Sequence, residues 1–180
     1  TATSRIPNTQ IISTGGTVTI TGTLYLYASS FTFTSGVVDA SASTLEFTSG
    51  GTASTTFTPG AIQYNDVKFA GLQLTTTITG TLTLNGTLTL ADAYSSPGYL
   101  NGGTIQAKGN VVLSNYGKPG TTLIKVSGSS NQTITGGGAS AYIPNLEINS
   151  SAGTVYLVGI IHLRGNYTYT AGSVDSTGST

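Results

Sequence analysis

Short segments in which threonine alternates with an apolar residue recur along most of the chain. Examples are Thr17–Thr21, Thr81–Leu84, Thr87–Leu90 and Thr154–Leu157. A period of two residues places alternate side chains on opposite faces of a β-strand, so each segment predicts a short strand with one buried face. Glycine, asparagine or serine separates the segments, and no long stretch has the i, i+3, i+4 pattern of an amphipathic helix. We therefore expect an all-β protein.

The two ends of the chain resemble each other in sequence. Ile6–Asn8 recurs as Ile143–Asn145, and Phe31–Asp39 recurs as Tyr167–Asp175 with its aromatic pair in the same place. A weaker third copy lies between them. The chain is thus expected to be a single repeat-built β domain over residues 1–180, with related copies near residues 6–44, 65–90 and 143–180.

Three glycines that occupy similar places in the copies, Gly22, Gly80 and Gly159, give the repeat spacing. The interval from the second to the third is longer than that from the first to the second by roughly 20 residues, which is a typical length for one winding of a solenoid. On this spacing the two intervals correspond to three and four windings. This predicts a parallel β-solenoid, or β-helix, of about nine windings. A β-sandwich with duplicated hairpins is the alternative fold, since it gives similar spacings.

A solenoid stacks equivalent residues of successive windings in ladders. The glycine spacing predicts that Leu24 and Leu82 share one inward ladder, and that Leu26 and Leu84 share another. Stacked like charges would lie about 5 Å apart and repel one another. Only 7% of the residues are charged, against roughly 25% in an ordinary domain. Such a low content of charged residues suits a fold in which equivalent side chains stack on one another.

Composition excludes several classes of function. Lys plus Arg and Asp plus Glu each total 6, so the net charge is zero and we expect no nucleic-acid binding. The chain has no Cys and one His, His162, which excludes a disulfide framework and a structural zinc site. No apolar run approaches the length of a membrane-spanning helix. We expect no cofactor and no metal.

The acidic residues do not predict an active site. Asp39 and Asp175 occupy the same repeat position, which favours a structural role in a turn. Asp66, Lys68 and Glu147 would favour a polysaccharide-degrading enzyme only if they met in one groove. We therefore expect no catalytic residue and no enzymatic activity.

Two kinds of binding module remain as alternatives. Ranks of threonine, such as Thr81 with Thr83, are similar to those on ice-binding solenoids, although larger side chains including Tyr156 interrupt them. Three segments, 91–103, 114–120 and 136–142, are expected to protrude as loops. Their tyrosines are candidate contacts for surface glycans: Tyr94, Tyr99, Tyr116 and Tyr142.

Four asparagines lie in the N-x-Ser/Thr pattern that accepts N-linked glycans. They are Asn85, Asn131, Asn149 and Asn166. The chain is thus a possible glycoprotein if its source modifies exported proteins.

The best-matched part of the chain resembles a known class of repeats. The segments Asn145–Asn149, Gly153–Leu157, Ile161–Leu163 and Tyr167–Asp175 resemble the Thr/Gly/Ser-rich parallel β-helix repeats of large prokaryotic secreted surface proteins, which include adhesins and filament subunits. The resemblance implies an extracellular or cell-surface location and a structural or adhesive role. It carries over no catalytic residue.

These observations together predict a subunit or segment of a cell-surface filament or adhesin stalk. Thr180 aligns with Thr44, after which the first copy continues without a break, and no capping helix is visible. We therefore expect the solenoid to stack head to tail on copies of itself or on further windings, through its β edges.

Overall fold

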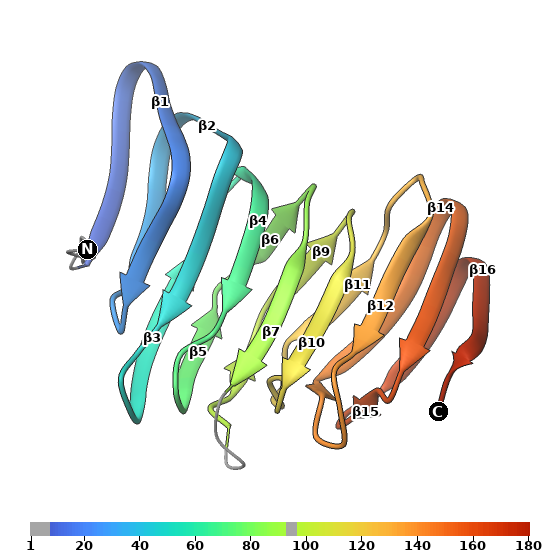
Figure 1. Ribbon diagram of the computed structural model, residues 1–180. Coiled ribbons are helices and arrows are strands. Elements are labelled where there is room, and N and C mark those ends of the chain that lie inside the picture. The colour runs from blue at the N-terminus through green and yellow to red at the C-terminus, as the bar shows by residue number, and fades with distance from the viewer. Residues whose placement is uncertain (1–7, 93–96) are drawn as a thin grey trace.

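The computed structural model describes residues 8–92 and 97–180. These residues contain strands but no helix, and they coil into a parallel β-solenoid of about eight turns. Figure 1 shows the windings following one another from the N-terminus to the C-terminus. Every strand pairing among the described residues is parallel. The predicted solenoid is therefore confirmed over the sandwich.

The strands differ widely in length, from 2 to 19 residues. They are β1 (Thr9–Tyr27), β2 (Phe31–Thr48), β3 (Ala53–Thr58), β4 (Gln63–Phe69), β5 (Leu74–Ile78), β6 (Thr81–Leu84), β7 (Leu88–Asp92), β8 (Leu100–Asn101), β9 (Thr104–Ala107), β10 (Val111–Asn115), β11 (Leu123–Val126), β12 (Gln132–Gly136), β13 (Tyr142–Ile143), β14 (Asn145–Gly159), β15 (His162–Leu163) and β16 (Tyr167–Ser179).

Each winding contributes to three stacks of strands, which we call faces. The first face contains β3, β5 and β8, and bridges from Leu100 to Gly120 and from Gly117 to Tyr142 continue it toward β13 and β15. The second face contains β6, β9 and β11, and the third contains β7, β10 and β12. Longer strands such as β14 turn a corner and pair on two faces.

The core consists of apolar ladders that run along the solenoid. On the third face, paired positions of successive windings are occupied by Leu45, Val67, Leu88, Val111 and Ile134. All five side chains are buried. Each inward residue covers the one in the winding below, so alternation in the sequence becomes a continuous hydrophobic column.

The winding length explains why there are about eight turns and not nine. Hydrogen bonds between neighbouring windings join Asp66 to Thr87 and Asn110 to Thr133, at sequence separations of 21 and 23. Corners between the faces need these extra residues. The predicted period of roughly 20 residues is therefore slightly short, and the structure has about eight turns where about nine were predicted.

The predicted ladders were wrong, because the glycines used for spacing turn different corners. Gly22 pairs with Ser43 inside a long strand, whereas Gly80 lies between β5 and β6. Both have a positive φ, 69° and 92°, which a corner requires and glycine adopts readily. Leu24 accordingly pairs with Leu45, and it joins the third-face ladder and not that of Leu82.

Aromatic side chains fill the core of the early windings. Phe57 packs edge-on against Phe31 and Tyr64, with ring centroids 5.5 and 5.8 Å apart. It also lies 4.8 Å from Phe47, which stacks on Phe69 at the same distance. Burial raises the pKa of the Tyr64 hydroxyl. Interlocked rings of this kind fix the register of consecutive windings.

Candidate functional site

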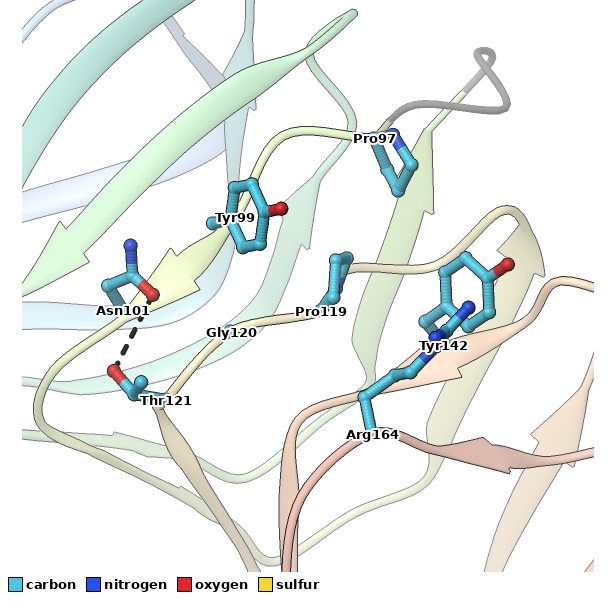
Figure 2. Close-up of a pocket in the computed structure, with 8 residues that line it drawn as sticks. All are labelled: Pro97, Tyr99, Asn101, Pro119, Gly120, Thr121, Tyr142 and Arg164. Carbon is cyan, nitrogen blue, oxygen red and sulfur yellow. Dashed lines mark hydrogen bonds between the residues drawn. The ribbon is translucent and has the colours of Figure 1, made fainter.

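A groove of about 590 Å³ opens where β8, β13 and β15 come together on the first face. Figure 2 shows the side chains around it. They are Pro97, Tyr99, Asn101, Pro119, Gly120, Thr121, Tyr142 and Arg164. The set combines two aromatic rings, one cation and neutral hydrogen-bonding groups, which is a typical composition for a ligand site.

The solenoid brings these residues together from four successive windings. Tyr99 comes directly before β8, Tyr142 lies in β13, and Arg164 follows β15. Figure 2 shows Tyr99 on one side of the groove and Tyr142 with Arg164 on the other, with Pro119 between them. Parallel stacking places each winding beside the last, so residues distant in sequence share one surface.

The floor of the groove depends on a close approach between two backbones. Gly120 pairs with Leu100, and its φ of 139° lies in the region that favours glycine. A Cβ at Gly120 would collide with the Leu100 carbonyl oxygen. The amides of Thr121 and Thr122 donate to that same oxygen, at 3.0 and 3.1 Å. The backbone at the floor of the groove therefore lies close to the neighbouring winding, and hydrogen bonds hold it there.

The cationic wall is a stacked pair of side chains. The Arg164 guanidinium carbon lies 4.1 Å from the centre of the Tyr142 ring, a cation–π contact. Side-chain hydrogen bonds from Ser140 and Arg164 lower the pKa of the Tyr142 hydroxyl. Among the described residues, no carboxylate lies within ion-pair distance of Arg164. The groove therefore carries an uncompensated positive charge.

A buried ion pair supports the groove from behind. The Lys118 ammonium lies 2.7 Å from Asp92 Oδ2, and the two side chains are 2% and 0% exposed. Lys118 also donates to the carbonyls of Gly71 and Leu74, at 3.0 and 3.2 Å. Burial lowers the pKa of Lys118, and the hydrogen bond and charge of Asp92 oppose that shift.

The same ion pair holds both sides of the groove in place. Asp92 accepts a hydrogen bond of 3.1 Å from the amide of Gly98, the residue before Tyr99. Lys118 directly precedes Pro119 in the floor. One buried contact thus fixes a wall and the floor together, as preorganised sites require.

The structure brings only some of the predicted tyrosines together. Tyr99 and Tyr142 line the groove, whereas Tyr116 is half-buried outside it, and Tyr94 lies outside the described residues. Segment 114–120 does not protrude as a loop, because Lys118 turns inward and Gly117 and Gly120 pair with neighbouring windings. That expectation was wrong.

Sequence reasoning missed Arg164 and Asn101 as groove residues. Arg164 follows Tyr142 by close to one winding, since Tyr142 pairs with His162 of the next winding. With the observed winding length, the sequence would have predicted that Tyr142 and Arg164 lie side by side. The shorter period taken from the glycines did not align them.

The acidic and basic residues considered for catalysis do not meet. Lys68 pairs with Glu46 at 3.3 Å, while Glu147 pairs with Lys125 at 3.1 Å on the second face. Asp66 accepts the Thr87 amide of the next winding. Burial raises the pKa of Glu147, but the hydrogen bonds and charge around it, chiefly from Lys125, lower it overall. Within residues 8–92 and 97–180, no three His, Asp or Glu side chains gather as a metal site would need.

Asp39 and Asp175 form the same turn at opposite ends of the molecule. Asp39 Oδ1 accepts from the amide and hydroxyl of Ser41, at 3.0 and 2.7 Å. Asp175 Oδ1 accepts from the amide and hydroxyl of Thr177, at 2.9 and 2.7 Å. The predicted role in turns is confirmed, and these side-chain and backbone hydrogen bonds lower the pKa of both carboxyl groups.

Acid is expected to weaken these two turns. A lowered pKa in the folded protein stabilises it above the usual value near 3.8, and this contribution is lost as the pH falls through the lowered value. The double variant Asp39→Asn/Asp175→Asn should therefore lose less stability between pH 5 and pH 2 than the parent. Thermal unfolding across this pH range measures the difference. Equal losses in the two proteins would contradict the assignment.

The predicted glycosylation sites occupy turns and edges of the windings. Asn85, Asn131 and Asn166 are exposed, whereas Asn149 is half-buried and donates to Glu147 at 3.1 Å. Asn131 Oδ1 accepts the Thr154 amide of the next winding at 2.9 Å. Modification of these sites stays a prediction.

The threonine ranks named from sequence lie on different faces. Thr81 and Thr83 belong to the second face, and Thr87 leads into the third. The first face carries another rank, in which Thr56 pairs with Thr77. The side chain of Tyr99, which is exposed, lies on the same face in the next winding.

Comparisons of the chain with models of known protein families, with curated proteins and with solved structures found no match. Among the described residues, no helix is long and apolar enough to cross a membrane.

Proposed function

We propose that this protein is an extracellular structural solenoid, a subunit or segment of a cell-surface filament or adhesin stalk. Its terminal windings would stack head to tail on those of a second copy. The observation that carries the proposal is the contrast between buried ladders inside the coil and exposed ladder positions at both of its ends.

The C-terminal winding presents apolar groups at positions that are buried one winding earlier. Tyr167 and Tyr169 pair with Leu146 and Ile148. The tyrosines are 50% and 56% exposed, whereas the residues beneath them are 4% and 0% exposed. Another parallel strand against β16 would cover the tyrosines in the way that β16 covers β14.

The N-terminal winding presents a similar edge. Val18 in β1 is exposed whereas its partner Val38 in β2 packs against the core, and β1 pairs with β2 alone among the described residues. The β1–β2 pair also resembles the β14–β16 pair in sequence. An edge with unpaired amides and carbonyls is a template for further strands, and a head-to-tail contact of two different ends propagates into a rod.

The low charge of the chain favours such stacking. With 7% charged residues and no net charge, successive copies would bring few like charges together. The secreted surface repeats that the sequence resembles support an extracellular location.

Sedimentation velocity over a range of protein concentrations tests the proposal. The parent should form rods whose length increases with concentration. Tyr167→Lys places a charge on the stacking edge and should weaken association by at least about tenfold. Tyr156→Lys is the matched control, because Tyr156 is exposed on a side face, and it should assemble as the parent does.

Two results would contradict the proposal. One is a parent protein that stays a monodisperse monomer and has slowly exchanging edge amides in β1 and β16. The other is equal assembly of the Tyr167→Lys variant and its control.

A further inference from the structure

We propose that the groove between Tyr99 and Arg164 binds an acidic saccharide, a glycan that contains hexuronate units. Tyr99 stacks on the apolar face of a sugar ring, Arg164 pairs with the carboxylate, and the side chains of Asn101 and Thr121 bind hydroxyl groups. The groove spans four windings from Tyr99 to Arg164, and Arg164 follows β15, the last strand of the first face among the described residues.

Tyr99 is an aromatic platform that is both accessible and held in place. It is 54% exposed. Its amide donates to Thr75 Oγ1 at 3.2 Å, and the Gly98 amide before it is tied to buried Asp92. An exposed ring on a fixed backbone loses little conformational entropy on contact with a ligand, and its face suits the C–H groups of a sugar.

Arg164 selects for negative charge. It is the sole charged residue among those that line the groove. The planar guanidinium matches a carboxylate with two parallel hydrogen bonds. Asp92 lies behind the groove, and its negative charge is already neutralised by Lys118. It therefore does not cancel the positive charge of Arg164.

Peptides and nucleic acids fit the groove less well. A peptide that adds a strand needs an open sheet edge. The backbone of Leu100 is already paired, because its amide donates to the Pro119 carbonyl at 2.8 Å and its carbonyl accepts the Thr121 amide at 3.0 Å. A nucleic acid needs several cations along its phosphates, and the groove supplies one. A glycan needs only the ring, the cation and the neutral polar groups that are present.

Titration calorimetry with defined oligosaccharides tests the inference on the intact chain. The probes are trimers of galacturonate, glucuronate and mannuronate, the neutral galactose trimer and a glutamate tripeptide. At least one hexuronate trimer should bind about tenfold more tightly than the neutral trimer and the peptide. Arg164→Gln should abolish the preference for the acidic sugar, and Tyr99→Ala should weaken binding about tenfold. Tyr99→Phe should bind as the parent does.

Tyr156→Ala provides the matched control, since it removes an exposed tyrosine from another face. It should leave binding unchanged. The inference is overturned if no hexuronate trimer binds at millimolar concentration, if the neutral trimer or the peptide binds equally well, or if Arg164→Gln and Tyr99→Ala bind like the control. Sedimentation of the same variants separates these outcomes from a failure of rod assembly.

Discussion

Replacing Lys118 with methionine is expected to lower the free energy of unfolding by about 3–5 kcal/mol, because Asp92 would stay buried without a cation. The Asp92 side chain is 0% exposed, and the two groups are 2.7 Å apart. Chemical denaturation followed by circular dichroism measures the loss. The variant should also bind hexuronate more weakly, since the groove floor and the Tyr99 backbone depend on this contact.

An exposed ion pair provides the control for this prediction. Lys68 is 40% exposed and lies 3.3 Å from Glu46. Lys68→Met should cost less than about 1 kcal/mol, as exposed pairs usually do. The double variant Lys118→Met/Asp92→Asn should recover part of the loss, because no buried charge remains. Equal effects of Lys118→Met and Lys68→Met would show that the buried pair does not hold this part of the coil together.

Replacing Phe57 with alanine is expected to cost a similar amount, about 3–5 kcal/mol. Phe57 is fully buried and contacts Phe31, Phe47 and Tyr64. Removing its ring leaves a cavity between consecutive windings, which the stacked backbone cannot close. Denaturation of the variant gives the total loss. Hydrogen exchange should show faster opening in the early windings than in β11 to β16, because each winding is stabilised by its neighbours.

The conservative variant Phe57→Leu tests whether the cavity is the cause. It keeps most of the buried apolar volume and should cost clearly less than Phe57→Ala. Equal losses in the two variants, or a loss below about 1 kcal/mol in Phe57→Ala, would show that the aromatic cluster does not fix these windings.

Local patterns in the sequence predicted the short strands of the middle windings well, but not the register of the strands or the long strands β1, β2, β14 and β16, which run through glycines such as Gly22. The alternation in Thr81–Leu84 corresponds to β6, and Leu82 and Leu84 are buried as expected. The number of windings and the ladders depended on which glycines were taken as equivalent. Because Gly22 and Gly80 turn different corners, their spacing misplaced the ladders and gave a period that was too short. Register follows from the pairing of distant strands, which no local pattern contains.

The candidate site could also be predicted only in part from the sequence. Tyr99 and Tyr142 are aromatic residues in segments rich in glycine and proline, and this pattern marked them as contacts. Lys118 stands in such a segment too, and there the pattern indicates exposure. Its burial arises because Asp92 and two carbonyls from other windings surround its ammonium group. This environment depends on the three-dimensional stacking of the windings.

Electron microscopy of the purified protein at high concentration tests the central claim most directly. Eight windings at a strand spacing of about 4.8 Å give a unit roughly 38 Å long. The proposed stacking predicts rods with a repeat of about 4.8 Å along their axis and lengths in multiples of this unit. Single particles of one unit length at every concentration would contradict it.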